Sequence, residues 1–204
     1  MLLFLDVISP IPEFLLIEDN KVILQRKIIN KESDKLSDNI FEIYMQINNH
    51  YNLDQKLKKI SITIGPGSYT SLRVGASFVA GLTISKKLLF YSFSIDDIFK
   101  FELNNQNNNN AGIYINSANN QNFMCILDNK NKIHYYKLED DNFVLPENIN
   151  TILYNEKKLD LSDKNIEQFK FSFAENLFQN YKRLDFSLNQ IVKPIYISNN
   201  KILN

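Results

Sequence analysis

The hydrophobic positions in the first half of the chain form short apolar runs, separated by two longer segments with a helical repeat. Runs of strand length rich in apolar residues predict strands, and apolar residues three and four positions apart predict helices. Asp19 and Asn20 are typical of a tight hairpin turn, and Ser33 is a suitable helix N-cap. The predicted order is strands at 2–7, 13–18 and 21–29, a helix at 34–51, a strand at 59–64, a helix at 70–86, a strand at 88–93 and a short helix at 94–101.

The second half repeats this order in outline but lacks a helix after its third strand. It has apolar runs at 112–116, 122–127, 132–138 and 151–154, a helical pattern at 172–182 and an extended piece at 191–197. Three antiparallel strands followed by strand–helix crossovers are typical of ribonuclease-H-like, actin-like units. We therefore expect an α/β protein with the actin-like ATPase fold, built from two ribonuclease-H-like lobes in tandem with the second trimmed. The lobes are predicted at 1–103 and 111–204, with the Asn-rich tract 104–110 as their hinge.

The composition is that of an ordinary globular protein and narrows the function mainly by exclusion. The 204 residues include 23 basic and 23 acidic side chains, and a net charge of zero argues against a nucleic-acid binder with a broad basic face. Any RNA contact is expected to be local or shared with a partner. The single cysteine, Cys125, allows no internal disulfide, and the N-terminus lacks a signal-peptide pattern. Because Lys86 and Lys87 interrupt the apolar region 74–93, we expect no membrane span and a cytoplasmic protein.

The stretch GPGSYTSLRVG at 65–75 joins a predicted strand to a predicted helix. Two glycines flank Pro66 in a turn that permits positive φ, and Ser68 or Thr70 is expected to cap the helix. The N-terminus of such a helix can bind an anion. However, the stretch lacks the lysine of a P-loop and the glycine spacing of a dinucleotide-binding turn, so the pattern supports a phosphate site only weakly.

The helix after this turn has two unusual features. Arg73 lies in its first turn, where the helix dipole favours acidic residues, so we expect a carboxylate or phosphate partner, with Asp6 as an internal candidate. From Ser71 to Leu82, small residues recur four positions apart between large apolar ones. The helix is therefore either covered on both sides by its own chain, or its outer side is a subunit interface.

GPGSYTSLRVG closely resembles the signature GPGS[FY]TGLR[IV]G of the bacterial TsaB (YeaZ-like) family, with Ser71 in place of a glycine. Weaker similarities to the same family occur elsewhere, mainly within the first half. They are LLFLD at 2–6, SDKL at 33–36, LLFYSFSIDDIF at 88–99 and KPIYIS at 193–198.

The departures from the family pattern concern residues that an ATPase of this fold would use. The family's Asp-Thr-Ser after the first strand is Asp6-Val7-Ile8 here, so the hydroxyls are lost. The acidic motif that opens the family's second lobe appears as NSANNQNF at 116–123, in which Asn116 and another amide replace carboxylates. Amides cannot act as general bases or offer charge to Mg²⁺, so these changes argue against nucleotide hydrolysis.

The resemblance implies a non-catalytic subunit for the synthesis of N6-threonylcarbamoyladenosine (t6A) in tRNA. Such a subunit pairs with the catalytic paralogue TsaD, is joined by the ATPase TsaE, and in isolation forms a homodimer through the same helices. It reaches tRNA only through the complex and needs no cofactor or metal of its own. The motif turn would comprise Gly65, Pro66, Gly67, Ser68, Tyr69, Thr70 and Arg73. The partner interface would comprise Leu36, Ile40, Ile43, Tyr44, Ile47, Leu72, Gly75, Ala76, Phe78, Val79 and Leu82.

The main alternative is a small ATPase or kinase of the same fold. Asp6 is retained at the end of the first strand, but Asn116 removes the obvious acidic partner in the second lobe. Other carboxylates are available, although ordinary surface roles are expected for them: Asp96, Asp97 and Asp128.

A peptidase or metalloenzyme is not supported by the pattern. His50 and His134 lie in different predicted lobes without metal-ligand spacing around them. Cys125 lies within an apolar strand, which indicates a core residue and not a nucleophile.

Overall fold

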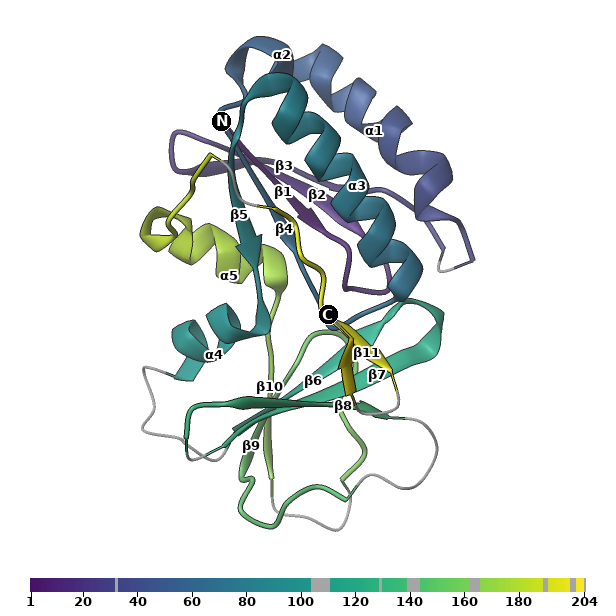
Figure 1. Ribbon diagram of the computed structural model, residues 1–204, viewed down its shortest axis with the longest axis vertical. Helices are drawn as coiled ribbons and strands as arrows, with labels where there is room; N and C mark the ends of the chain where they lie inside the picture. Colours follow the sequence, from purple (N-terminus) through teal and green to yellow (C-terminus); the bar gives the residue numbers. More distant parts are fainter. Residues whose placement is uncertain are drawn as a thin grey trace.

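The computed structural model of the protein describes residues 1–31, 33–103, 111–128, 130–138, 144–161, 166–188, 191–198 and 201–203. It has two lobes, one above the other in Figure 1, and each is built on a five-stranded mixed sheet. The strand order is β3-β2-β1-β4-β5 in the first sheet and β8-β7-β6-β9-β10 in the second. The same order in both sheets confirms the predicted tandem of actin-like, ribonuclease-H-like units.

The first sheet follows the predicted strands closely. Its first three strands form an antiparallel meander, and the other two run parallel to β1. Asp19 and Asn20 have φ values of 50° and 62°, as the predicted hairpin turn requires. The strands are β1 (Leu2–Asp6), β2 (Glu13–Glu18), β3 (Lys21–Lys27), β4 (Lys59–Thr63) and β5 (Leu89–Phe93).

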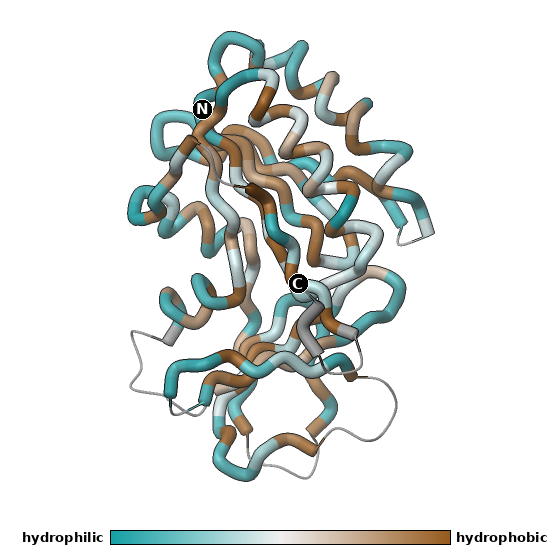
Figure 2. The backbone as a smooth tube through the Cα atoms, in the orientation of Figure 1, coloured by the Kyte–Doolittle hydropathy of each residue, from teal (hydrophilic) through white to brown (hydrophobic). Residues whose placement is uncertain are grey.

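Helices α1 (Leu36–Tyr51) and α3 (Tyr69–Lys86) lie side by side over the first sheet, and the short helix α2 (Leu53–Lys56) follows α1 (Figure 1). Hydrophobic residues are concentrated along the strands beneath them (Figure 2), and the buried core that begins there continues into the second lobe and the helix α5 (Phe173–Asn180). No helix within the described ranges is long and apolar enough to cross a membrane.

The predicted cap at Ser33 is wrong, because α1 begins two to three residues later with Lys35 at the N-cap position. The carboxylate of Asp34 accepts hydrogen bonds from the backbone N–H groups of Asn30 and Lys31. These bonds hold the chain in a turn, and the helix starts only after that turn ends.

The second lobe is trimmed, as predicted, but more extensively. None of the described residues between β8 and β9, or between β9 and β10, belongs to a helix. Strand β10 was not predicted, because its sequence EQFK is mostly polar and lies at the edge of the sheet. The strands are β6 (Ala111–Ser117), β7 (Gln121–Leu127), β8 (Ile133–Leu138), β9 (Thr151–Tyr154) and β10 (Glu167–Lys170).

The C-terminal part of the chain returns to the first lobe. Helix α5 (Phe173–Asn180) contacts β1 and the helix α4 (Ile95–Leu103), and Ser187 forms a β-bridge with Phe90. The hairpin of β11 (Tyr196–Ser198) and β12 (Lys201–Leu203) then contacts β8 of the second lobe. The boundary predicted at 104–110 lies outside the described residues, and the lobe limits remain a prediction.

Candidate functional site

The turn at the start of α3 is shaped by the C-terminal segment. Gly65 has a φ of 115°, and a Cβ atom there would lie 2.6 Å from the carbonyl oxygen of Ile195. The backbone N–H of Ile195 donates a hydrogen bond to the carbonyl of Ile64, directly before this glycine. Gly65 is therefore needed for its backbone angle and for the close approach of a distant segment.

One of the backbone N–H groups at the start of α3 is already used within the protein. The backbone N–H of Ser68 donates to the hydroxyl oxygen of Ser117, at the end of β6, over 2.9 Å. A side chain at Gly67 would come within 3.2 Å of the same oxygen. Ser68 occupies the N-cap position, but its side chain caps nothing, so the predicted capping by Ser68 or Thr70 is wrong. The N–H of Ser68 is therefore bonded to a hydroxyl of the second lobe and is not available to an anion.

Arg73 extends over the surface and braces the turn through an aromatic ring. Its guanidinium lies 5.3 Å from the ring centre of Tyr69, and that ring contacts Tyr196 at 4.8 Å. Among the described residues Arg73 pairs with no carboxylate, and the suggested pairing with Asp6 is wrong because that side chain is buried in other hydrogen bonds. The partner of Arg73 is the ring of Tyr69, which in turn contacts the ring of Tyr196 in a tilted arrangement.

Asp6, at the end of β1, is buried and holds the following loop. Its Oδ1 accepts hydrogen bonds from the hydroxyl of Thr63 at 3.0 Å and from the N–H of Ile8 at 2.9 Å. Burial raises the pKa of Asp6, and hydrogen bonds from Ser9, Ile8 and Thr63 partly oppose that increase. The carboxylate therefore fixes the conformation of the loop that follows β1.

Asn116 holds the corresponding place in the second lobe within a network of amides. Its side chain donates to Asn122 at 3.0 Å and accepts from the N–H of Lys157 at 2.7 Å. The side-chain amide of Asn155 accepts a hydrogen bond from the backbone N–H of Asn116 and donates one to its backbone carbonyl. Both side-chain ends of Asn116 are therefore engaged. Sequence reasoning missed Asn155, because only the alignment of β6 with β9 brings it there.

The cleft between the lobes has a volume of about 650 Å³ and mixed charge. Its charged lining consists of Asp6, Glu13, Glu156, Glu175, Lys27, Lys157 and Lys170. Burial raises the pKa of Glu13, and the nearby charges of Asp6 and Glu156 raise it further. A hydrogen bond from Gln25 and the charge of Lys27 partly lower it again. The cleft offers no surplus of positive charge to a polyphosphate.

Substitutions of Asp6 test this account of the loop. Asp6→Asn keeps an acceptor for Thr63 and Ile8 and removes a buried charge, so stability at neutral pH should be unchanged or higher. Asp6→Ala leaves buried donors unpaired and should lower the free energy of unfolding by roughly 2–3 kcal/mol. Urea unfolding followed by circular dichroism measures both changes. Equal losses in the two variants would contradict the assigned hydrogen bonds.

The same pair of proteins gives a pH signature. Since the folded-state pKa of Asp6 is raised from 3.8, the folded protein binds this proton more tightly than the unfolded chain. The stability linked to Asp6 is therefore complete below the unfolded pKa and is lost as the pH rises through the folded one. The stability of Asp6→Asn relative to wild type should increase as the pH rises from about 4.

Most of the predicted interface residues lie within the core of the first lobe. Phe78 packs between the rings of Tyr44 and Phe14, which joins α3 to α1 and to the sheet. Partly buried members of the set are Ile43, Ala76, Phe78 and Leu82. Buried members are Leu36, Ile40, Tyr44, Ile47, Leu72, Gly75 and Val79.

Two large apolar side chains on these helices are exposed and were not predicted. Phe41 on α1 is 64% exposed, and Ile84 on α3 is 81% exposed. Both lie outside the stripes that periodicity assigns to the core, and an apolar residue on the polar side of such a stripe is the signal that could have identified them. The interface itself remains a prediction.

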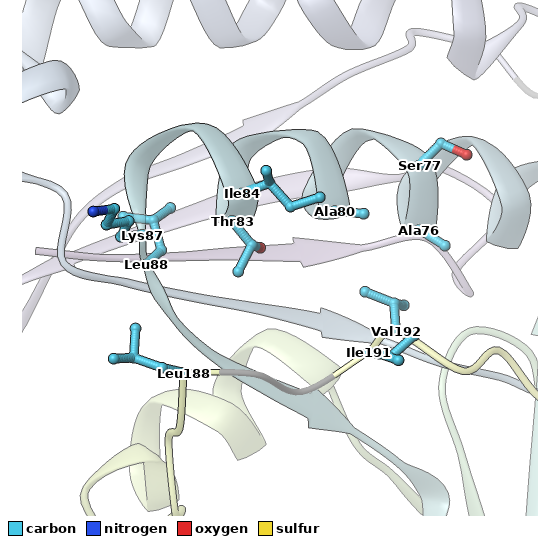
Figure 3. A pocket seen from close by; sticks show the side chains of 10 residues that line it. All are labelled: Ala76, Ser77, Ala80, Thr83, Ile84, Lys87, Leu88, Leu188, Ile191 and Val192. Atoms are coloured by element: carbon cyan, nitrogen blue, oxygen red, sulfur yellow. The ribbon is translucent and has the colours of Figure 1, made fainter.

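A groove of about 790 Å³ runs between α3 and the C-terminal segment. In Figure 3, Ala76 and Thr83 point from the helix toward the segment that carries Leu188, Ile191 and Val192. Small residues four positions apart leave room on the helix side, and the exposed Ile84 lines the same groove. The small-residue face of α3 therefore borders an open apolar groove.

The remaining candidate residues have local roles. Cys125 is fully buried, and burial raises the pKa of its thiol. The surface role expected for Asp97 is wrong, because its side chain is buried and accepts hydrogen bonds from the backbone and hydroxyl of Ser94 at the start of α4. His134 pairs with Asp128 at 2.8 Å, which helps to hold the pKa of that carboxyl at about 2. Within the described residues, no three metal-ligating side chains come together.

Comparisons with known proteins agree with this geometry. A family model described as TsaD, tRNA N6-adenosine threonylcarbamoyltransferase, matches residues 23–192. YeaZ from Pseudomonas aeruginosa has a similar structure, with a TM-score of 0.62, 13% identity, and coverage of 96% of this chain and 99% of its own. A second similar structure is that of an uncharacterized protein with similarity to peptidase YEAZ from Pseudomonas aeruginosa. Its TM-score is 0.65 and its sequence identity 13%, and the match covers 97% of this chain and 99% of that chain. At this identity both show a shared fold. None of the curated proteins compared matches the chain.

Proposed function

Because the chain belongs to the TsaD family and has the fold of YeaZ, we propose that it is a TsaB-like, non-catalytic subunit for t6A synthesis in tRNA. In this proposal it pairs with a catalytic TsaD homologue through helices α1 and α3. The observation that carries it is the exposed apolar surface on these helices: Phe41 is exposed on α1, and Ile84 is exposed beside the groove on α3.

The arrangement of the cleft supports a non-catalytic role. The loop after β1 is held by Asp6 itself, and the acidic position of the second lobe is occupied by the engaged amide of Asn116. The N–H of Ser68 at the start of α3 is bonded to Ser117. Groups that would contact phosphate in an ATPase of this fold are thus bonded within the chain.

The wider assembly follows from the same proposal. We expect a TsaE homologue to join the pair, and the isolated chain to form a homodimer over the surface that the TsaD homologue would otherwise cover. The tRNA enters through the complex, in the cytoplasm. A homodimer and the heterodimer then compete for one face, so adding the TsaD homologue should dissociate the homodimer.

Size-exclusion chromatography of this protein with its cognate TsaD homologue tests the proposal. We expect one peak with both chains at low micromolar concentration, and t6A formation on tRNA that depends on this protein. Two separate peaks would contradict the pairing. ATP turnover by the purified protein, abolished in Asp6→Asn, would contradict the non-catalytic role and support the alternative of a small ATPase or kinase.

A further inference from the structure

Basic groups gather at one end of the first lobe, where strands β1, β4 and β5 begin. The N-terminal amine donates to the carbonyl of Lys56, and the N–H of Lys58 donates to the carbonyl of Met1. The carbonyl of Lys58 accepts from Leu89, the first residue of β5, which follows Lys87 by two positions. We call this surface the basic end, and its charged members are the N-terminal amine, Lys56, Lys58, Lys59, Lys86, Lys87, Lys182 and Arg183.

The C-terminal segment contributes to the same surface. Tyr181, which begins the 3₁₀ turn Tyr181–Arg183, lines a small hollow of about 300 Å³ together with Met1, Lys58 and Lys59. The hydroxyl of Tyr181 also donates a hydrogen bond to the side chain of Asn20, in the turn of the β2–β3 hairpin. Lys182 and Arg183 directly follow and are exposed.

The acidic groups nearby are fewer and partly neutralised. Glu18 and Asp19 line the same hollow, Asp185 lies on the C-terminal segment, and Asp54 forms an ion pair with Lys86. Lysines in the last turn of a helix complement the helix dipole, which accounts for Lys56 and Lys86.

One exposed charge at the basic end, Lys58, lacks this explanation because it lies in the connecting segment before β4. Lys182 and Arg183 lie in the last turn of the 3₁₀ helix, where basic residues also complement the dipole. Lys87 caps α3 and is one of the residues that line the apolar groove at the end of this helix (Figure 3). In a chain with zero net charge, this positive surplus is a local surface property.

We propose that the basic end contacts the phosphate backbone of RNA when the chain is bound to its catalytic partner. This inference rests on the proposed function, which supplies a tRNA. The basic end adjoins the proposed partner surface, because Ile84 and Lys87 line the same groove. A partner bound to α3 would therefore lie next to the basic end. An RNA held by that partner can then extend across Lys58 and Lys87.

The chemistry fits backbone contact and not base recognition. Exposed lysines act as mobile point charges, which bind phosphates without reading sequence. Each neutralised phosphate releases counterions, so the affinity falls linearly with salt on a double logarithmic scale, with a slope of about 0.7–0.9 per contact. The salt dependence therefore counts the contacts that the basic end makes.

Lys58→Gln/Lys87→Gln tests the inference, with Lys130→Gln/Lys132→Gln as the matched control. The control removes two exposed lysines from the β7–β8 hairpin of the other lobe. Fluorescence anisotropy with labelled tRNA measures the affinity of the purified complex, and of the chain alone, over a series of salt concentrations. The Lys58/Lys87 variant should lower the salt slope by roughly 1–2 and weaken binding about 10-fold at low salt, whereas the control should match wild type.

Each outcome separates this inference from the function on which it rests. If the complex forms and both variants bind tRNA like wild type, the basic end is not a phosphate contact, although the proposed pairing stands. If no complex forms, the proposed pairing fails, and this inference fails with it because the contact requires the bound partner. Vesicles containing phosphatidylserine that bind the wild type in place of tRNA would overturn the assignment to RNA.

Discussion

Gly65→Ala is expected to destabilise the protein by about 3 kcal/mol or more. The backbone φ of 115° is rarely adopted by residues with a side chain, which alone costs about 1–3 kcal/mol. The added methyl group would also lie 2.6 Å from the carbonyl oxygen of Ile195, a backbone atom that cannot rotate away. Relief requires the C-terminal segment to move, which disturbs the hydrogen bond from Ile195 to Ile64.

Gly81→Ala is the matched control for this experiment. Gly81 is an exposed residue within α3, and no heavy atom lies within 4 Å of the position that its Cβ would take. Alanine at an exposed helical position is favoured over glycine by about 1 kcal/mol, so this variant should be more stable than wild type. Urea unfolding followed by circular dichroism compares the three proteins, and equal stability of Gly65→Ala and wild type would show that Ile195 does not pack on the turn.

The contrast between these glycines changes the interpretation of the motif. By its sequence, the Gly-Pro-Gly turn is a weakened phosphate loop. In the structure, the motif at 65–75 contacts three parts of the chain: the C-terminal segment at Gly65, Ser117 of the second lobe at Gly67, and the core at Gly75 within α3. The motif fixes the two lobes and the C-terminal segment relative to one another.

Local patterns were sufficient to predict most of the fold. Strands of the first lobe are apolar runs of five to seven residues, and the two long helices have a clear repeat, so their order followed directly. The repeated strand order of the two sheets was inferred from the same order of elements. Strand β10 was not predicted, because an edge strand of four mostly polar residues has no apolar pattern.

The candidate site was harder to predict, because its contacts join residues far apart in the chain. Ser117 bonds Ser68 across 49 positions, and Asn155 bonds Asn116 across 39. Periodicity identifies the apolar stripe of a helix but not which element covers it. The residues of the stripe that were assigned to the interface, such as Val79, pack largely against the protein's own sheet and helix. The exposed Ile84 lies outside that stripe.

Ile84→Asp is expected to weaken pairing with the TsaD homologue by about 100-fold or more while the chain remains folded. The side chain is 81% exposed, so a charge there is solvated in the single chain and costs little stability. In the proposed complex the same position is covered by apolar surface, and an unpaired charge buried in an interface costs about 2–5 kcal/mol. Phe41→Asp on α1 should act in the same direction. Isothermal titration calorimetry gives the dissociation constants.

Val144→Asp is a close control, because Val144 is 82% exposed and lies in the second lobe, outside the proposed interface. It should bind the partner like wild type. Val79→Asp tests the effect of a charge at a buried position. Because Val79 is fully buried, this replacement should lower the free energy of unfolding of the first lobe by several kcal/mol. If Ile84→Asp and Phe41→Asp both pair with wild-type affinity, the partner does not use the exposed side of α1 and α3. Because these variants introduce the same charge at exposed and at buried positions, the comparison separates loss of pairing from loss of the fold.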